Sequence, residues 1–307
     1  MLRSMYAGIS GMKGFQTKLD TIGNNIANVN TYGYKKGRTT FQDMMSQTMS
    51  GAQGPTLGAA GGNVRGGLNP SQVGLGSQMG SVDTVHTQGN RQTTNRPLDM
   101  AIEGDGMFVF AEAGNAGVNV AAKTVALDQV NMMFSRAGNF YLDDDGAIVN
   151  NNGQYLIGEA YTGEPPVGTG QSGIITIPQD AQSFSIQTDG TVNYIDNNGA
   201  PQVAGQIMLA KFSNVSGLQK MGGNMFQNTN NAGMIMGADD ALNGLDDLSV
   251  PGEGGTGQMI SGSLEMSNVD LAESFTEMIT AQRGFQANTR IITTSDEILQ
   301  ELVNLKR

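Results

Sequence analysis

The chain has 307 residues, a formal net charge of −11, and neither cysteine nor tryptophan. Its length allows one large domain or two ordinary ones, and the lack of cysteine excludes disulfides and thiolate metal sites. Glycine contributes 44 residues and aromatic side chains only 6%, so the composition favours many tight turns over one large dense core.

Charge is distributed unevenly along the chain. Residues 1–100 hold nine basic and four acidic side chains, whereas the rest holds eight basic and 24 acidic ones. This acidic excess argues against nucleic acid as a partner of the body. No stretch approaches the roughly twenty apolar residues of a membrane span, and glycine, serine and lysine interrupt the opening residues. We therefore expect no membrane insertion and no cleaved secretory signal.

The first expected element is an amphipathic helix over residues 1–30. Apolar residues recur at alternating steps of three and four, and Gln16 and Gly23 fill the two remaining positions of this heptad stripe. The helix is predicted to stop near Asn28 to Thr31, where asparagine, threonine and glycine replace the apolar period. The predicted stripe consists of Leu2, Met5, Ile9, Met12, Leu19 and Ile26.

Residues 31–80 are predicted to be an extended connector. From residue 50 onward this segment is rich in glycine and polar residues and has little to bury. It separates the helical end of the chain from the body.

The middle of the chain is predicted to be an antiparallel β body of residues 81–158 and 204–269, with residues 159–203 as a smaller insertion or outer lobe. Short β-prone runs alternate with Asp-Gly and Asn-Gly pairs, which supply the positive φ angles that hairpins need. The runs are 107–110, 140–142, 148–149, 155–157, 174–177, 191–195 and 207–210. The turn glycines are Gly106, Gly146, Gly153, Gly190 and Gly199.

A second amphipathic helix is expected over residues 270–307. Ser267 and Asp270 are spaced as in a capping box, which would open this helix. Gln282, Thr289 and Asp296 occupy polar positions within its stripe. The apolar positions of the stripe are Leu271, Phe275, Met278, Phe285, Ile292, Leu299 and Val303.

The two terminal helices have complementary charges. Residues 1–38 hold six basic side chains against one acid, and residues 262–307 hold seven acids against four basic side chains. We therefore predict a mixed α and β fold in which long terminal helices pair as a coiled-coil-like layer, with an antiparallel β-rich body between them. The alternative is that each helix packs on its own domain's core.

No residue pattern indicates catalysis or a cofactor. His86 is the sole histidine and has no neighbouring cysteine or paired carboxylate. The run Asp143 to Asp145 could suggest a calcium loop, but the terminal bidentate glutamate is missing, and a polar hairpin tip also explains the run. We expect no enzyme and no cofactor. A glycan hydrolase and an adhesin module are the more remote alternatives.

Five segments carry a resemblance to a known family. They are Met1 to Phe41, Leu98 to Phe110, Phe134 to Gly158, Gln206 to Thr229 and Ser261 to Gln300. In this order they resemble the bacterial flagellar rod and hook axial proteins. The resemblance implies a tubular homopolymer whose paired terminal helices form the inner wall, with the β body outside.

Within that family, residues 1–20 and 74–90 are more similar to the hook subunit than to the distal rod subunit. The resemblance thus implies a bendable hook that transmits torque from the basal body to the filament, with the rigid rod as the alternative. The short middle is similar to the compact Gram-positive form.

The resemblance also implies residues, partners and location. Distal rod, hook cap and hook-filament junction proteins would be its partners, and the chain would be exported to the flagellum without a cleaved signal peptide. The family motif at the end of the first helix corresponds to Asn24, Asn25, Asn28, Asn30 and Gly33.

Overall fold

The computed structural model describes residues 2–57, 63–112, 118–119, 123–127, 130–162, 167–235 and 245–305. The chain divides into two compact units. Unit 1 contains Met1–Ala27, Gly37–Thr84 and Asp270–Arg307, and unit 2 contains Asn28–Lys36 and Val85–Val269. The predicted division was different, because it set residues 31–80 apart as a connector and residues 159–203 as a lobe.

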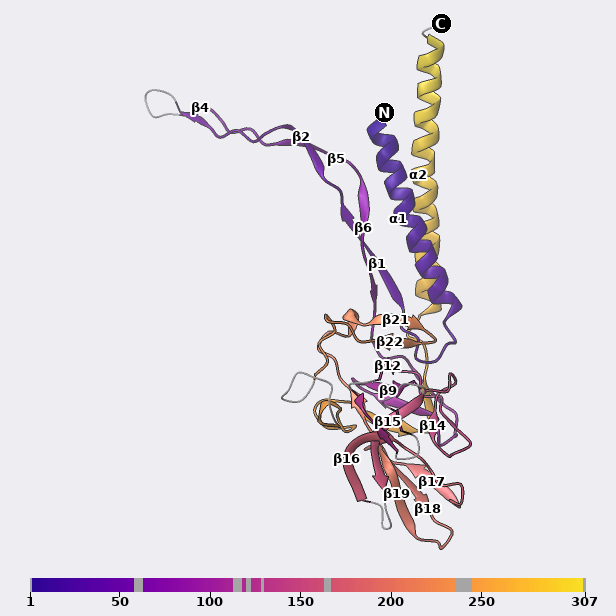
Figure 1. Cartoon of the computed structure of the whole chain (residues 1–307). Coiled ribbons are helices and arrows are strands. Elements are labelled where there is room, and N and C mark those ends of the chain that lie inside the picture. Colours follow the sequence, from indigo (N-terminus) through magenta and orange to yellow (C-terminus); the bar gives the residue numbers. More distant parts are fainter. Residues whose placement is uncertain are drawn as a thin grey trace. The chain divides into compact units, whose positions relative to one another are not determined.

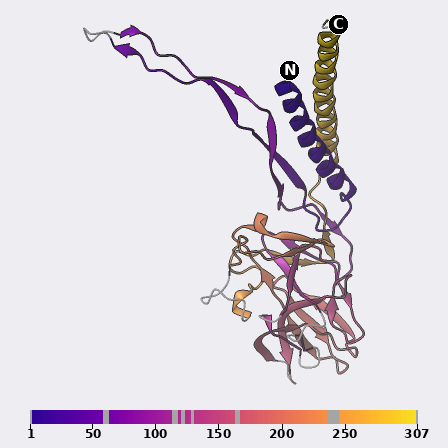
Figure 2. The ribbon, with the colours of Figure 1, turned by 45° about the horizontal axis from the view of Figure 1, so that its top comes forward.

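Two long helices and a hairpin arm make up unit 1. Helix α1 spans Leu2–Ala27 and ends where the sequence predicted, and α2 spans Leu271–Leu305. The two helices lie side by side in both views, as the indigo and yellow ribbons of Figures 1 and 2. Neither of these described helices contains a segment that is both long enough and apolar enough to cross a membrane.

The start of α2 differs from the predicted capping box. The Oδ1 atom of Asp270 accepts hydrogen bonds from the backbone N–H groups of Ala272 and Glu273, at 2.7 and 3.3 Å. Asp270 is therefore the N-cap. Ser267 lies three residues earlier, where its hydroxyl accepts a hydrogen bond from the backbone N–H of Val269. The capping residue thus differs from the prediction, although α2 begins within one residue of the predicted start.

The segment predicted to be a connector contains a long two-stranded arm (Figures 1 and 2). Its strands pair antiparallel as β1 with β6, β2 with β5 and β3 with β4. Most of its described side chains are exposed, because two strands alone have no second layer to cover them. The strands are β1 (Gly37–Asp43), β2 (Ser46–Ser50), β3 (Thr56–Leu57), β4 (Asn63–Arg65), β5 (Ser71–Gly74) and β6 (Ser77–Thr84).

Unit 2 is the β-rich body, and its described strands pair antiparallel. Fourteen of them form one sheet, and two separate pairs, β8 with β23 and β7 with β24, join the start of the body to its end. Two short 3₁₀ helices complete it, η2 (Val215–Gly217) and η3 (Leu245–Asp247).

The strands of the body are β7 (Arg91–Thr93), β8 (Met100–Glu103), β9 (Met107–Ala111), β10 (Val118–Asn119), β11 (Thr124–Val125), β12 (Met132–Ser135), β13 (Tyr141–Leu142), β14 (Ile148–Val149), β15 (Tyr155–Thr162), β16 (Val167–Ile174), β17 (Ser183–Ile186), β18 (Thr191–Ile195), β19 (Pro201–Ile207), β20 (Leu209–Ala210), β21 (Gln219–Gly222), β22 (Met225–Gln227), β23 (Gln258–Ser261) and β24 (Ser263–Glu265).

The body has hydrophobic clusters on both faces of its sheet. Strand β9 contributes to both, because successive side chains point to opposite faces. Met107 and Val109 belong to one cluster, and Phe108 and Phe110 belong to the other. Unit 2 therefore has apolar cover of its own on both faces of the sheet.

Several predicted strands and turns occur at the predicted positions. Strand β18 matches its predicted run, and β9, β14 and β15 contain theirs, whereas β16 ends at Ile174, where the predicted run began. The five predicted turn glycines all have positive φ. Residues 159–203 contribute strands β15 to β19, which belong to the large sheet.

Candidate self-assembly site

The helices of unit 1 contact each other in antiparallel order through small residues. A Cβ atom placed on Gly8 would lie 3.4 Å from the side chain of Ile292, and one on Gly284 would lie 2.6 Å from the ring of Phe15. The Thr289 hydroxyl also donates a hydrogen bond to the Met12 sulfur at 3.4 Å. Glycine at these positions lets the two backbones approach closely.

Four of the six apolar positions predicted on α1, and four of the seven predicted on α2, are partly buried. Met5, Met12, Leu19 and Ile26 of α1 are partly buried, and so are Met278, Phe285, Ile292 and Leu299 of α2. The alternate predicted positions are exposed, including Ile9, Leu271, Phe275 and Val303. Leu2 is part of α1, and its side chain lies outside the described set.

The residues that actually complete the contact are mostly small. Gly8 contacts Asn288 and Phe15 contacts Gly284, and the other buried residues of the two helices include Ile22 on α1 and Ser274, Ala281 and Ser295 on α2. The sequence stripe was built from large apolar residues and so missed them. Of the large residues in the predicted stripes, Ile9, Leu271, Phe275 and Val303 are exposed in the single chain.

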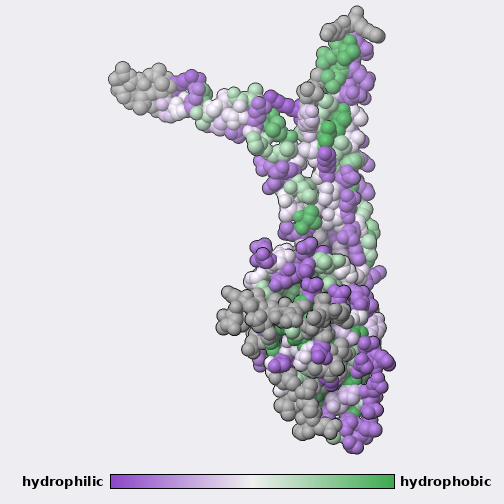
Figure 3. Space-filling model, viewed as in Figure 1, coloured by the Kyte–Doolittle hydropathy of each residue, from purple (hydrophilic) through white to green (hydrophobic). Residues whose placement is uncertain are grey.

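An apolar surface therefore remains open on α2. Phe275 and Ile279 are each 50% exposed, and Val303 is 66% exposed. Figure 3 shows hydrophobic side chains in green on the visible face of the helix pair and the arm. Further exposed apolar side chains of unit 1 are Tyr6, Ile9, Met45, Met49, Met79, Val82, Ile291, Ile298, Leu302 and Leu305.

The base of the arm is attached to α1. The Asn25 side chain donates to the carbonyl of Gly37 at 2.8 Å and accepts from the Gly37 N–H at 2.9 Å. The rings of Phe15 and Phe41 lie 6.0 Å apart, which is within the range of favourable aromatic pairs. These contacts make the arm part of the helical unit.

Asn25, Asn28 and Gly33 of the predicted motif each make a defined contact within the chain. Asn25 holds Gly37, and the Asn28 side chain accepts a hydrogen bond from the Thr31 hydroxyl. Gly33 has a φ of +68°, and a Cβ there would lie 2.5 Å from the backbone nitrogen of Ala137. Asn24 and Asn30 are exposed.

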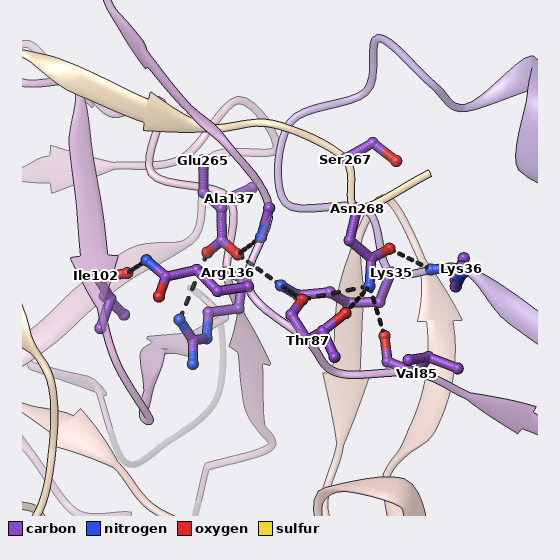
Figure 4. Close-up of polar contacts among 12 residues, drawn as sticks. Lys35, Lys36, Val85, Thr87, Ile102, Arg136, Ala137, Glu265, Ser267 and Asn268 are labelled. Atoms are coloured by element: carbon purple, nitrogen blue, oxygen red, sulfur yellow. Dashed lines mark hydrogen bonds and ion pairs between the residues drawn. The ribbon is translucent and has the colours of Figure 1, made fainter. Parts of the chain in front are cut away.

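A buried ion network joins the two ends of the body (Figure 4). Lys35 Nζ lies 2.5 Å from Glu265 Oε1, and both side chains are almost fully buried. Arg136 Nη1 lies 3.4 Å from Glu265 Oε2, and its Nη2 donates to the Gly104 carbonyl at 2.6 Å. The carboxylate also accepts a hydrogen bond from the Gly89 N–H at 3.0 Å.

Asn268 adds a second set of contacts in the same place. Its side chain accepts from the Lys36 N–H at 2.7 Å and donates to the Val85 carbonyl at 2.8 Å and to Thr87. Together, Glu265 and Asn268 tie residues 28–36, 85–89 and 265–268, the three segments of unit 2 that continue in sequence into unit 1.

Burial dominates the electrostatics of this network. It lowers the pKa values of Lys35 and Arg136, and the Glu265 carboxylate opposes both shifts. Breaking a buried ion pair by removing one partner is strongly destabilising, because the other charge stays uncompensated. The sequence reasoning missed all three residues, although a Lys-Lys pair directly after the asparagine motif was a visible signal.

The Asp143 to Asp145 run lies in a hairpin turn between β13 and β14. The backbone N–H of Asp143 donates to Ala147 at 2.9 Å, and Gly146 donates back to Asp143. In the part of the chain that the structure describes, no group of three histidine or acidic side chains could hold a metal ion.

Three family models match the chain. Residues 5–35 match the flagella basal body rod protein model, and residues 124–194 match the flagellar hook protein FlgE/F/G D1 domain. Residues 260–305 match the C-terminal model of the flagellar basal body rod FlgEFG proteins. The first and last of these contain most of α1 and α2.

Relatives match over the whole chain. The flagellar basal-body rod protein FlgG of Bacillus subtilis is 50% identical over 307 residues, which cover 100% of each chain. The chain belongs to the flagellar rod and hook family. FlgG of Caulobacter vibrioides is 35% identical over 306 residues, with 99% of this chain and 100% of the relative covered. The flagellar hook protein FlgE of Borreliella burgdorferi is 31% identical over 458 residues, again with both chains fully covered.

Family membership confirms the broad expectation drawn from the five sequence segments. This rod and hook protein is a structural component of the flagellum and serves motility, and it is not an enzyme. The glycan hydrolase and adhesin alternatives are therefore dropped. Rod and hook proteins form the polymers of the flagellar axis, so contacts between copies are relevant to the exposed surfaces of unit 1.

Proposed function

We propose that this chain is a subunit of the flagellar rod, which polymerises through unit 1 into a stiff tubular shaft that transmits torque. The observation that carries the proposal is the 50% identity to a rod protein over the full length of the chain. The hook is the second candidate, since residues 1–20 and 74–90 favoured it in the sequence.

Alignment length supports the rod over the hook. The match to the Bacillus subtilis rod protein needs no position beyond the chain's own 307. The match to the Borreliella hook protein extends over 458 positions, so 458 − 307 = 151 of them have no counterpart in this chain. A second hook relative, from Treponema pallidum, aligns over 482 positions. In length, the chain thus matches the rod relative better than the two hook relatives, which supports the rod proposal.

The exposed apolar residues of unit 1 supply the driving force for polymerisation. Burying a side chain such as Phe275 or Ile279 contributes roughly 1.5–3 kcal/mol, and copies that stack along α1 and α2 would bury several at once. Heterologous contacts repeated by a rotation that does not close give an open helical tube. In this arrangement the paired helices form the coiled-coil-like inner wall.

The arm would add stiffness to such a tube. Met45 and Met49 are exposed by 83% and 69%, and Met79 and Val82 on β6 are also exposed. A hairpin with apolar side chains and no core of its own is suited to lie against a neighbouring copy.

Deletion and localisation test the rod against the hook. In a strain that lacks this chain, the rod proposal predicts basal bodies with neither a complete shaft nor a hook. Gold-labelled antibody against residues 159–203 should mark the shaft within the basal body of the complemented strain. A complete rod in the deletion strain, or label on the curved segment outside the cell, would instead identify a hook subunit.

A further inference from the structure

A cavity of about 200 Å³ lies inside unit 2, beside the ion network. A water molecule requires about 10–15 Å³ on the same measure, so the cavity has room for a small polyatomic ligand. Its polar lining comes from Lys35, His86, Asp105, Arg136, Lys211 and Ser213.

The lining offers more hydrogen-bond donors than acceptors. Lys35 uses two of its three N–H groups, for Glu265 and the Thr87 carbonyl, and Lys211 uses one, for the Gly254 carbonyl at 2.9 Å. An ammonium group has three donors and no acceptor. The two lysines therefore keep N–H groups for a ligand.

His86 brings two unpartnered ring nitrogens to the lining of the cavity. Both ring nitrogens are buried, and neither has a hydrogen-bond partner among the described residues. The ring packs against Phe226 in a tilted arrangement, with ring centroids 5.4 Å apart. A buried polar group without a partner costs free energy, so a bound acceptor would recover part of that cost.

The charges around the ring favour an anion. Burial, together with the positive charges of Lys35, Lys220 and Arg136, lowers the pKa of His86 to about 4. Glu265 compensates Lys35 and Arg136 from within the network. Asp105 also lines the cavity, and an anion would bind at the end away from this carboxylate.

We propose that this cavity binds a small tetrahedral oxyanion of the phosphate or sulfate type. Lys211 and Lys35 donate to its oxygens, and His86 contributes a ring N–H. The ligand would also stabilise the point where residues 28–36, 85–89 and 265–268 are tied together. This inference concerns unit 2 alone and holds whether the subunit belongs to a rod or a hook.

The sole histidine makes the test direct. The full-length monomer, with labelled histidine, is titrated with sodium phosphate and separately with sodium chloride at equal ionic strength and fixed pH, while the His86 ring signals are followed by NMR. Phosphate should shift these signals in a saturable way and raise the pKa of His86 from about 4 toward its usual 6.5, because a neighbouring negative charge favours the protonated ring.

Two variants test whether phosphate binds in the cavity that Lys211 lines. Lys211→Gln should weaken the apparent affinity for phosphate about tenfold, as expected for one lost charge-assisted hydrogen bond. Arg65→Gln, which removes an exposed positive charge from unit 1, should leave the affinity unchanged. The proposal fails if phosphate and chloride shift the ring signals alike, if the shift does not saturate, or if Lys211→Gln binds phosphate as tightly as the parent.

Discussion

The two units of the chain differ in how they bury apolar surface. In unit 2, Phe108, Phe134 and Phe140 are fully buried, along with most of the hydrophobic core. In the described part of unit 1, by contrast, Ile22 and Ala281 are the fully buried apolar residues, and most of the exposed large ones of the chain lie there. Unit 2 therefore has its own core, whereas unit 1 has little.

This contrast gives each unit a different source of stability. Two helices that bury apolar surface only against each other gain little stabilising free energy. Ordering each residue costs roughly 1–2 kcal/mol of backbone entropy, which largely offsets that gain. Unit 1 should therefore gain its full stability only when neighbouring copies cover it, which is folding on binding. Unit 2 should keep its fold in the free monomer.

The largest expected effect comes from removing the buried carboxylate of unit 2. Glu265→Gln leaves Lys35 and Arg136 buried with uncompensated charge and should lower the free energy of unfolding by about 3–5 kcal/mol. Urea unfolding followed by circular dichroism measures it.

The matched control for that change is Glu103→Gln. It breaks the pair with Arg91, which is partly exposed on both sides, and should cost less than about 1 kcal/mol. Equal losses in the two variants would mean that the buried network does not stabilise the body.

A pair of glycines tests how tightly the motif segment packs on the body. Gly33 and Gly153 both have positive φ, but a Cβ at Gly33 meets the backbone of Ala137, whereas one at Gly153 meets nothing within 4 Å. Gly33→Ala should destabilise unit 2 by about 3 kcal/mol, and Gly153→Ala by about 1 kcal/mol. Similar melting temperatures for the two variants would contradict the packing described.

His86 predicts a pH dependence of unit 2. Its pKa is about 4 in the folded chain and about 6.5 in an unfolded one, so the unfolded state binds the proton more readily. The contribution of His86 to the free energy of unfolding is therefore fully present above pH 6.5 and is lost as the pH falls toward 4. Its total is up to about 3 kcal/mol.

His86→Phe isolates that contribution, because it keeps a ring against Phe226 and cannot titrate. In phosphate-free buffer, the free energy of unfolding of this variant should fall less steeply between pH 6.5 and pH 4 than that of the parent. Parallel pH profiles would show that His86 is not buried as described.

Local signals in the sequence predicted much of the fold. The 3.6-residue period predicted both helices, and the Asp-Gly and Asn-Gly pairs predicted the turns, since both depend on neighbouring residues. The arm was not foreseen as a hairpin, because residues 37–84 lack the alternating apolar pattern of a half-buried strand. The capping residue was predicted wrongly because Ser267 and Asp270 are both suitable N-cap residues and lie only three positions apart.

The assembly surface could be predicted only in part. Apolar spacing found the helix faces but placed Phe275 and Leu271 toward the partner helix, because small residues such as Ala281 and Gly284 carry little hydrophobic signal. The Lys35 and Glu265 pair is separated by 230 positions, and no local pattern indicates such a contact. Both wrong or missing predictions concern residues that are distant in the sequence and come into contact only in the folded chain.

Polymer formation by a variant of the exposed α2 face tests the central claim, that the surface left open on unit 1 is what joins the subunits. Phe275→Ser combined with Ile279→Ser should leave the unfolding of unit 2 unchanged and abolish pelletable tubes, while Glu277→Ser with Gln286→Ser on the same helix should polymerise normally. If the apolar double variant still forms native-like tubes of undiminished length, the open surface of α2 does not drive assembly.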